Sequence, residues 1–275
     1  MPELPEAEIT KQKLQILINK KVKNFWTNLK SNLKITPYLK VKKDIFQRKI
    51  KTIQRWGKAI LFYLIKNNDE KILAFHLRMS GNLIIKNQKE KLSKYVHFII
   101  QFQDGKELWF EDQRKFGIVW YGNKSEILSD SYFKKLGVDF LNLKFKDFYK
   151  IISSKKGVIK AVLLSQKNFS GIGNILADEA LYLAKIHPQT KANKLSLKQI
   201  KQLWQALNKV IFKSIKAGGT SMRNWRNPEN QKGNFQNKTY VYGRIGKNCL
   251  RCQAKIIKIK TAGRGTHLCP KCQKI

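Results

Sequence analysis

Residues 95–111 read Tyr95-Val96-His97-Phe98-Ile99-Ile100-Gln101-Phe102-Gln103-Asp104-Gly105-Lys106-Glu107-Leu108-Trp109-Phe110-Glu111, and this stretch decides the fold of the first half of the chain. Two runs rich in aromatic and β-branched residues, 95–103 and 107–111, lie on either side of Asp104-Gly105. That dipeptide is typical of tight hairpin turns. The stretch therefore predicts an antiparallel β-hairpin.

Similar short runs lie on both sides of this hairpin: Ala59–Ile65, Ile72–Met79, Asn82–Lys86 and Ile118–Tyr121. Many short strands separated by turn residues predict a β-sandwich or barrel, here over roughly residues 20–125. A helical pattern precedes it, from Pro5 to about Asn19, with apolar residues able to share one face.

After residue 125 the pattern changes. A less regular segment to about residue 147 predicts a linker, and helical periodicity follows. The clearest helix spans Leu197–Lys216, where Ser196 and Gln199 form a capping-box pattern and Gly218-Gly219 stops the helix. We expect an α+β multidomain protein with a β-sandwich domain at 1–130, a linker at 131–146, a helical domain at 147–240 and a cysteine module at 241–275.

The charge of the chain is extreme. Its 275 residues include 56 Lys and Arg against 18 Asp and Glu, a formal net charge of +38. Such an excess favours a polyanionic partner, and nucleic acid is the first candidate. A membrane surface also attracts lysine, but the sequence has no long apolar run and no signal-peptide pattern. We therefore expect a cytoplasmic protein without membrane segments.

All four cysteines lie near the end of the chain, as Cys249-Leu-Arg-Cys252 and Cys269-Pro-Lys-Cys272, sixteen residues apart. Two such pairs predict four thiolates around one Zn²⁺ ion. Disulfides are the alternative, which a reducing cytoplasm disfavours. A four-thiolate site is closed, so this zinc is structural. Between the pairs we expect a hairpin with Arg264 on its tip, Thr261–Gly265.

The chain begins Met1-Pro2-Glu3-Leu4-Pro5-Glu6. If Met1 is removed, the free end is the secondary amine of Pro2, and an α-amino group near pKa ~8 is partly neutral and nucleophilic at physiological pH. Two carboxylates, Glu3 and Glu6, lie within a few residues. Taken alone, the stretch also suits the start of a helix, where proline and acidic residues are favoured.

Several other short motifs are weak individually. Gly171-Ile172-Gly173-Asn174 opens a helix and offers backbone N–H groups to a phosphate, although Asn174 also suits a plain N-cap. The loops 76–81 and 112–117 combine basic and apolar residues; Met79 and Phe116 suit either the core or wedges that fill a vacated base position. Lys58 follows Gly57 at the start of a strand, where it suits contact with a phosphate or a reacting group.

Together these motifs occur in the order found in one family. The opening six residues, Lys58, the two loops, 171–181, Tyr240-Val241-Tyr242-Gly243 and the cysteine module closely resemble bacterial formamidopyrimidine-DNA glycosylase over essentially the whole chain. The resemblance implies a monomeric base-excision enzyme that acts on damaged double-stranded DNA, removes oxidised purines and nicks the strand. It also implies a helix-two-turn-helix domain with a lesion-capping loop at 220–238.

The resemblance also implies roles for single residues. Pro2 attacks the sugar C1′ and forms a Schiff base, Glu3 supplies a proton, and Lys58 and Arg264 assist β- and δ-elimination and bind phosphates. Glu6 lies near the flipped base. The remaining expected DNA contacts are His76, Met79, Arg114, Phe116, Lys155, Asn174 and Tyr242, with Arg114 against the orphaned cytosine.

Two alternatives remain open. An enzyme of the endonuclease VIII type would act on oxidised pyrimidines, but Leu4 and the Arg114 loop favour the purine branch. A non-catalytic zinc-containing nucleic-acid-binding protein would not need Pro2 and Glu3. The chain departs from the family pattern at Tyr95, where a histidine is frequent, and at Gln113, an unusual residue for which we expect a small effect.

Overall fold

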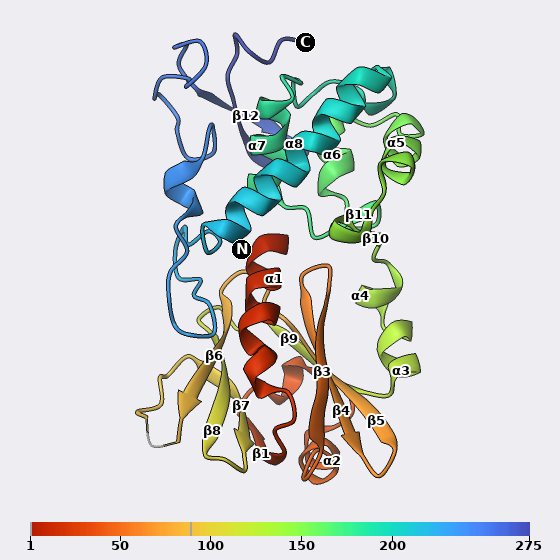
Figure 1. The fold of residues 1–275 in the computed structure, drawn as a ribbon, viewed down its shortest axis with the longest axis vertical. Helices are drawn as coiled ribbons and strands as arrows, with labels where there is room; N and C mark the ends of the chain where they lie inside the picture. Colours follow the sequence, from red (N-terminus) through yellow and green to blue (C-terminus); the bar gives the residue numbers. More distant parts are fainter. Residues whose placement is uncertain (1, 89) are drawn as a thin grey trace. The chain divides into compact units, whose positions relative to one another are not determined.

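The computed structural model describes residues 2–88 and 90–275. Its residues form two compact units. Unit 1 runs to Lys134 and also contains Gly218–Gly233, whereas unit 2 comprises Lys135–Ala217 and Asn234–Ile275. The mixture of sheets, helices and a small terminal hairpin confirms the expected α+β class (Figure 1).

Unit 1 contains two sheets, with strand orders β1-β7-β8-β6 and β2-β9-β5-β4-β3. Its elements are, in chain order, α1 (Leu4–Lys13), η1 (Leu14–Leu17), β1 (Val22–Thr27), η2 (Lys30–Asn32), β2 (Leu33–Ile35), α2 (Tyr38–Asp44), β3 (Lys49–Trp56), β4 (Ala59–Lys66), β5 (Asp69–His76), β6 (Gly81–Asn87), β7 (Val96–Phe102), β8 (Lys106–Asp112), β9 (Ile118–Gly122), α3 (Lys124–Ser129) and α4 (Ser131–Lys134).

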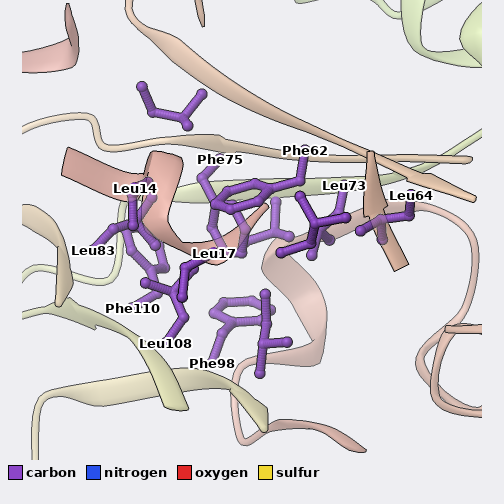
Figure 2. Packing of buried hydrophobic residues seen from close by; sticks show 14 of the residues in the cluster. Leu14, Leu17, Phe62, Leu64, Leu73, Phe75, Leu83, Phe98, Leu108 and Phe110 are labelled. Atoms are coloured by element: carbon purple, nitrogen blue, oxygen red, sulfur yellow. The ribbon is translucent and has the colours of Figure 1, made fainter. Parts of the chain in front are cut away.

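One hydrophobic core lies between the two sheets. Phe98 and Phe110 come from the four-stranded sheet, and Phe62 and Phe75 come from the five-stranded one (Figure 2). The rings of Phe75 and Phe110 meet edge to face at 5.4 Å between centroids, a favoured aromatic geometry. The expected sandwich is therefore the structure of unit 1.

The hairpin predicted from residues 95–111 is present. Strands β7 and β8 pair antiparallel, and Gly105 adopts φ +82° in the turn between them. Both faces of β8 are covered: Leu108 and Phe110 belong to the core between the sheets, whereas Trp109 packs on the opposite face in a second buried cluster with Val96 and Ile99. Strand β6, at the edge of this sheet, pairs with β8 along its whole length.

The N-terminal helix is shorter than predicted. An α-helix covers Leu4–Lys13, and a tighter 3₁₀ turn continues it to Leu17. The side chains from Leu4 to Thr10 are all buried, so this helix has no solvated face in its first two turns. Leu14 and Leu17 belong to the core between the sheets.

Unit 2 is mainly helical. Its elements are β10 (Val138–Asp139), η3 (Phe140–Asn142), α5 (Phe145–Ser153), α6 (Ile159–Leu164), β11 (Phe169–Ser170), α7 (Asn174–Leu183), η4 (Ala192–Lys194), α8 (Leu197–Lys216), η5 (Phe235–Lys238), β12 (Ile257–Thr261) and β13 (Arg264–Leu268). Helix α8 has the bounds and the Ser196–Gln199 capping box predicted from the sequence. The segment 125–147, expected to be irregular, instead contains α3, α4 and short elements.

The terminal hairpin is tighter than expected. Strands β12 and β13 pair from Ile257↔Leu268 to Thr261↔Arg264, which leaves only Ala262 and Gly263 in the turn. Both have positive φ, +52° and +69°, as a type I′ turn requires. Arg264 is therefore the first residue of β13 and not part of a five-residue loop.

Across residues 2–88 and 90–275, no helix combines the length and apolar character needed to cross a membrane.

Candidate active site

Pro2 and Glu3, at the start of the described residues, are buried in unit 1. Pro2 and Glu3 precede α1, and Glu3 is its N-cap. The backbone N–H of Glu3 donates to Glu6 Oε2 at 2.7 Å, and the Glu3 side chain caps the helix in return. This reciprocal capping box fixes the residue that follows Pro2, and Pro5 occupies the first helical turn. Met1 lies outside the described residues.

Glu6 also holds a distant segment. Its Oε1 accepts the backbone N–H of Thr220 at 2.7 Å, so one buried carboxylate joins the start of α1 to the first residue of the expected capping loop, 220–238. Burial raises the pKa of Glu6 to about 7, and the neighbouring charge of Glu3 adds to the rise. The Glu6 carboxyl therefore titrates near neutral pH.

Lys58 and His76 lie close together at the ends of two paired strands. Lys58 is in the turn between β3 and β4, and only 6% of its surface is exposed. Burial lowers the pKa of His76 to about 3, and the positive charges of Arg78 and Lys58 lower it further. His76 Nδ1 accepts the backbone N–H of Arg78 at 3.0 Å. The imidazole is therefore neutral and keeps only Nε2 for a further contact.

Met79 and Phe116 are exposed by 45% and 50%, so neither is a core residue. Both lie in turns, Met79 between β5 and β6 and Phe116 between β8 and β9. The Arg114 guanidinium contacts both: it lies 3.1 Å from Met79 Sδ and 4.7 Å from the centre of the Phe116 ring. The structure thus brings together the three residues that the sequence placed on two separate loops.

Asp112 organises these loops and was not singled out from the sequence. Its Oδ1 accepts from Ser80 Oγ and from the backbone N–H of Arg114, and its Oδ2 accepts from Gly117 N at 2.6 Å. Asp112 is 1% exposed, and a side chain at Gly117 would collide with Phe110. These contacts present Arg114 and Phe116 on a fixed turn.

In unit 2, Gly171-Ile172-Gly173-Asn174 forms the turn before α7. Gly173 is the N-cap, so Asn174 is the first helical residue and not the cap. Gln166 ties the turn by accepting from Gly171 N and donating to Ile172 O. Asn174 Nδ2 donates to Gly265 O at 3.0 Å, which links the helix start to the residue after Arg264.

Two adjacent acidic residues of α7 bind the backbone at Tyr242, one of the expected contact residues, and at His267. Asp178 accepts from Lys160 Nζ at 2.5 Å and from the backbone N–H of His267 at 2.8 Å. Glu179 accepts three consecutive backbone N–H groups, from residues 240–242, at 2.7 to 2.9 Å. Both carboxylates are at most 1% exposed.

Tyr242 lies within this group, its ring centre 4.5 Å from that of His267. Lys155 and Arg264 are exposed, and so are available to a solvent-borne anion.

The four cysteines meet at one point. All four sulfur atoms lie within 4.8 Å of one another, with 3.4 Å between Cys252 and Cys269 and 3.9 Å between Cys249 and Cys272. Zinc–sulfur bonds of about 2.3 Å in a tetrahedron place sulfurs about 3.8 Å apart, so the residues fit the ion. Tyr182 contacts Cys249 Sγ at 3.3 Å and packs in the same cluster.

Comparison with known proteins agrees with this geometry. Sequence profiles described as the formamidopyrimidine-DNA glycosylase N-terminal domain, its H2TH domain and the zinc finger found in FPG and IleRS match residues 1–119, 136–225 and 246–275. The formamidopyrimidine-DNA glycosylase of Listeria innocua is 36% identical, with 100% of both chains covered. This chain belongs to the formamidopyrimidine-DNA glycosylase family.

Other members are equally similar. The formamidopyrimidine-DNA glycosylase of Oceanobacillus iheyensis is 37% identical over 99% of this chain and 98% of its own. A solved complex of the Lactococcus lactis Fpg with an abasic site containing DNA superimposes with a TM-score of 0.90 at 34% identity, covering 99% of this chain and all of that one. The wild-type L. lactis protein bound to N7-benzyl-Fapy-dG containing DNA gives the same score and identity. As a member of this glycosylase family, the chain carries one structural zinc.

Proposed function

We propose that this glycosylase excises oxidised purines, 8-oxoguanine and formamidopyrimidines, from duplex DNA and then cuts the strand as an AP lyase. The observation that carries the proposal is the burial of Pro2 and Glu3 directly before α1. Pro2 directly precedes a carboxylate whose backbone is fixed by Glu6, and this end is next to the segment 218–233. Relatives with the same fold are solved with abasic-site and Fapy-dG DNA.

The chemistry starts from the Pro2 amine. Its nitrogen attacks C1′ of a flipped nucleotide, the glycosidic bond breaks, and the base leaves with a proton. Glu3 protonates the opening sugar ring, which gives an iminium at C1′. The iminium acidifies the C2′ proton; its removal, assisted by Lys58, expels the 3′-phosphate. A second elimination, assisted by Arg264, expels the 5′-phosphate.

We propose DNA contacts at the residues of this chain that match the contact positions of the family. Met79 and Phe116 fill the space left by the flipped base, and Arg114 contacts the orphaned cytosine. The exposure of Met79 and Phe116 and the contact of each with Arg114 support these roles. His76, Lys155, Asn174 and Tyr242 contact the DNA backbone, and Glu6 lies near the damaged base. The enzyme acts as a monomer on chromosomal DNA, and so in the cytoplasm at the nucleoid.

The domains follow this division of labour. We assign residues 1–130 to the catalytic sandwich, 131–146 to a linker, 147–240 to the DNA-binding helical domain and 241–275 to the zinc module. The capping loop proposed at 220–238 belongs to the helical domain by its position in the sequence, although its residues up to Gly233 pack within unit 1.

Borohydride trapping tests the mechanism. The processed enzyme, incubated with a duplex that carries 8-oxoguanine opposite cytosine, should give a covalent protein–DNA adduct. Pro2→Gly, or a protein that retains Met1, should give none. Absence of an adduct with the processed native enzyme would exclude the Schiff base. Faster cleavage of a 5-hydroxyuracil duplex would favour the endonuclease VIII type instead.

A further inference from the structure

Gln113 and Asn224 join two functional loops of unit 1. Asn224 Nδ2 donates a hydrogen bond to Gln113 Oε1 at 2.6 Å, across 111 positions of sequence. Gln113 directly precedes Arg114, and Asn224 lies in the segment 218–233 that begins at the Glu6 contact. The bond therefore connects the loop expected to face the orphaned base with the loop expected to cover the damaged one.

The Asn224 end is held by a buried amide. Asn82 Nδ2 donates to the main-chain O of Asn224 at 3.2 Å, and Asn82 Oδ1 accepts from Arg226 N at 3.0 Å. Asn82 is 5% exposed and lies on β6, the edge strand of its sheet. Ile85 N donates to Pro228 O at 2.9 Å further along the same strand. The main chain of residues 224–228 is thus hydrogen-bonded to the edge strand β6, and the side chain of Asn224 extends from it to Gln113.

The Gln113 end is also rigid. Arg114 N donates to Asp112 Oδ1 and to Ser80 Oγ, both at 3.2 Å, and Lys115 adopts φ +56°. Because these bonds hold Gln113 and Arg114 in one turn, a force on Arg114 shifts the turn as a unit and moves Gln113 with it. Gln113 and Asn224 together line a pocket of about 210 Å³ with Ser80, Asn82, Tyr95 and Arg223.

We propose that Gln113 and Asn224 form a latch that makes closure over the damaged base depend on the base in the opposite strand. Gln113 is a positioning residue for specificity, since it acts through Arg114 on one side and Asn224 on the other. When Arg114 is seated against cytosine, the latch holds 218–233 closed. A different opposite base displaces Arg114 and, through the Gln113–Asn224 bond, shifts residues 218–233 away from their closed position. The inference rests on the proposed function and names a determinant of its specificity.

The test compares Gln113→Leu, Asn224→Leu, the double variant and the exchange Q113N/N224Q, which preserves a donor and an acceptor. Each is assayed in single turnover on 8-oxoguanine opposite cytosine, on 8-oxoguanine opposite adenine, and on a preformed abasic site opposite cytosine. We expect either single variant to slow excision opposite cytosine about fivefold, the size of one hydrogen bond and more than the small effect expected at Gln113 from the sequence. Excision opposite adenine and abasic-site cleavage should change less than twofold.

The double variant should be no slower than either single one, because the bond that the two residues share can be lost only once. The exchange Q113N/N224Q should recover most of the rate, because it restores a bond between two amides. Gln103→Leu is the matched control, since it too removes an exposed bond between two side-chain amides, here to Gln47, and should leave all rates unchanged.

Additive losses, equal losses on the abasic site, or an unchanged preference for cytosine would overturn the latch while leaving the proposed function intact. A wild-type enzyme that excises from neither duplex would overturn both.

Discussion

Glu6 Oε1 accepts the backbone N–H of Thr220 at 2.7 Å while Glu6 Oε2 accepts that of Glu3 at 2.7 Å. One carboxylate thus fixes the backbone of Glu3, beside the proposed nucleophile, and the backbone of Thr220, where the segment proposed to cover the base begins. A side chain at Gly219 would lie 2.8 Å from Trp225 and 3.2 Å from Glu6 Oε1, so glycine permits this close approach. Because Glu6 binds both segments, a change in its protonation should also affect the position of the loop that begins at Thr220.

Stability should therefore depend on pH through Glu6. Its pKa is about 7 in the folded chain against an ordinary value of 4.5. Between pH 4.5 and pH 7 the Glu6 carboxyl binds more protons in the folded state than in the unfolded state. The contribution of this group to the free energy of unfolding is therefore complete below pH 4.5 and is lost as the pH rises through 7. The loss is on the order of 3 kcal/mol. Glu6→Gln, which does not titrate, should lack it.

Urea unfolding of both proteins at pH 5 and pH 8 measures this. The wild type should lose free energy of unfolding relative to Glu6→Gln between the two values. Parallel behaviour of the two proteins would show that the carboxyl has an ordinary pKa. The variant is itself expected to be less stable at pH 5, by about 1 kcal/mol, because its amide cannot accept both N–H groups.

Local patterns in the sequence predicted the elements whose side chains follow a regular period. The β7–β8 hairpin and α8 are examples, since a turn dipeptide and a capping box define their ends. Strands β1 and β3 were not identified singly. Each contains a register shift, between Val22 and Asn24 and between Ile50 and Thr52, which breaks the alternation of side chains. Strand β7 has such a shift as well, between Val96 and Phe98, but the Asp104-Gly105 turn marks its end, and β1 and β3 lack a signal of that kind.

In the candidate site too, the sequence could not predict contacts between residues that are distant in the chain. The cysteines could be identified because zinc ligation depends on residue type and spacing, whereas Pro2 is proposed as the nucleophile only through the family resemblance, since alone the stretch also suits a helix start. Asp178 and Glu179 could not, since two adjacent acidic residues on a helix look like a solvated face. Their partners, Lys160, His267 and residues 240–242, are distant in sequence, and only folding brings them together.

The buried ion pair of unit 2 should be costly to break. Lys160 Nζ and Asp178 Oδ1 are 2.5 Å apart, and both side chains are fully buried. Lys160→Met leaves Asp178 without its partner charge, which should destabilise the protein by about 3–5 kcal/mol. Thermal unfolding of the zinc-loaded protein would show it. The double variant K160M/D178N should be more stable than the sum of the single losses implies, and strict additivity would argue against a coupled pair.

Zinc should matter for DNA binding more than for the sandwich. Cys249→Ala removes one of four ligands, so the protein should no longer hold one zinc per chain, measured by metal analysis. The β12–β13 hairpin and Arg264 then lose their support, and affinity for abasic-site DNA should fall at least tenfold. Lys271→Ala, between two ligands, is the control and should retain the metal. Unchanged affinity after zinc loss would refute the hairpin's role.

Salt dependence should reveal which cations contact phosphates. Each phosphate neutralised contributes about 0.9 to the slope of log Kobs against log salt concentration. Arg264→Ala and Lys155→Ala should each reduce the slope by about that amount, whereas Lys42→Ala, an exposed lysine of α2 outside the proposed contacts, should lower affinity little and leave the slope as it is. Fluorescence anisotropy with duplex DNA between about 50 and 200 mM salt covers the steep range. Equal slopes for all four proteins would mean that Arg264 and Lys155 touch no phosphate, and that the high net charge acts only as a diffuse field.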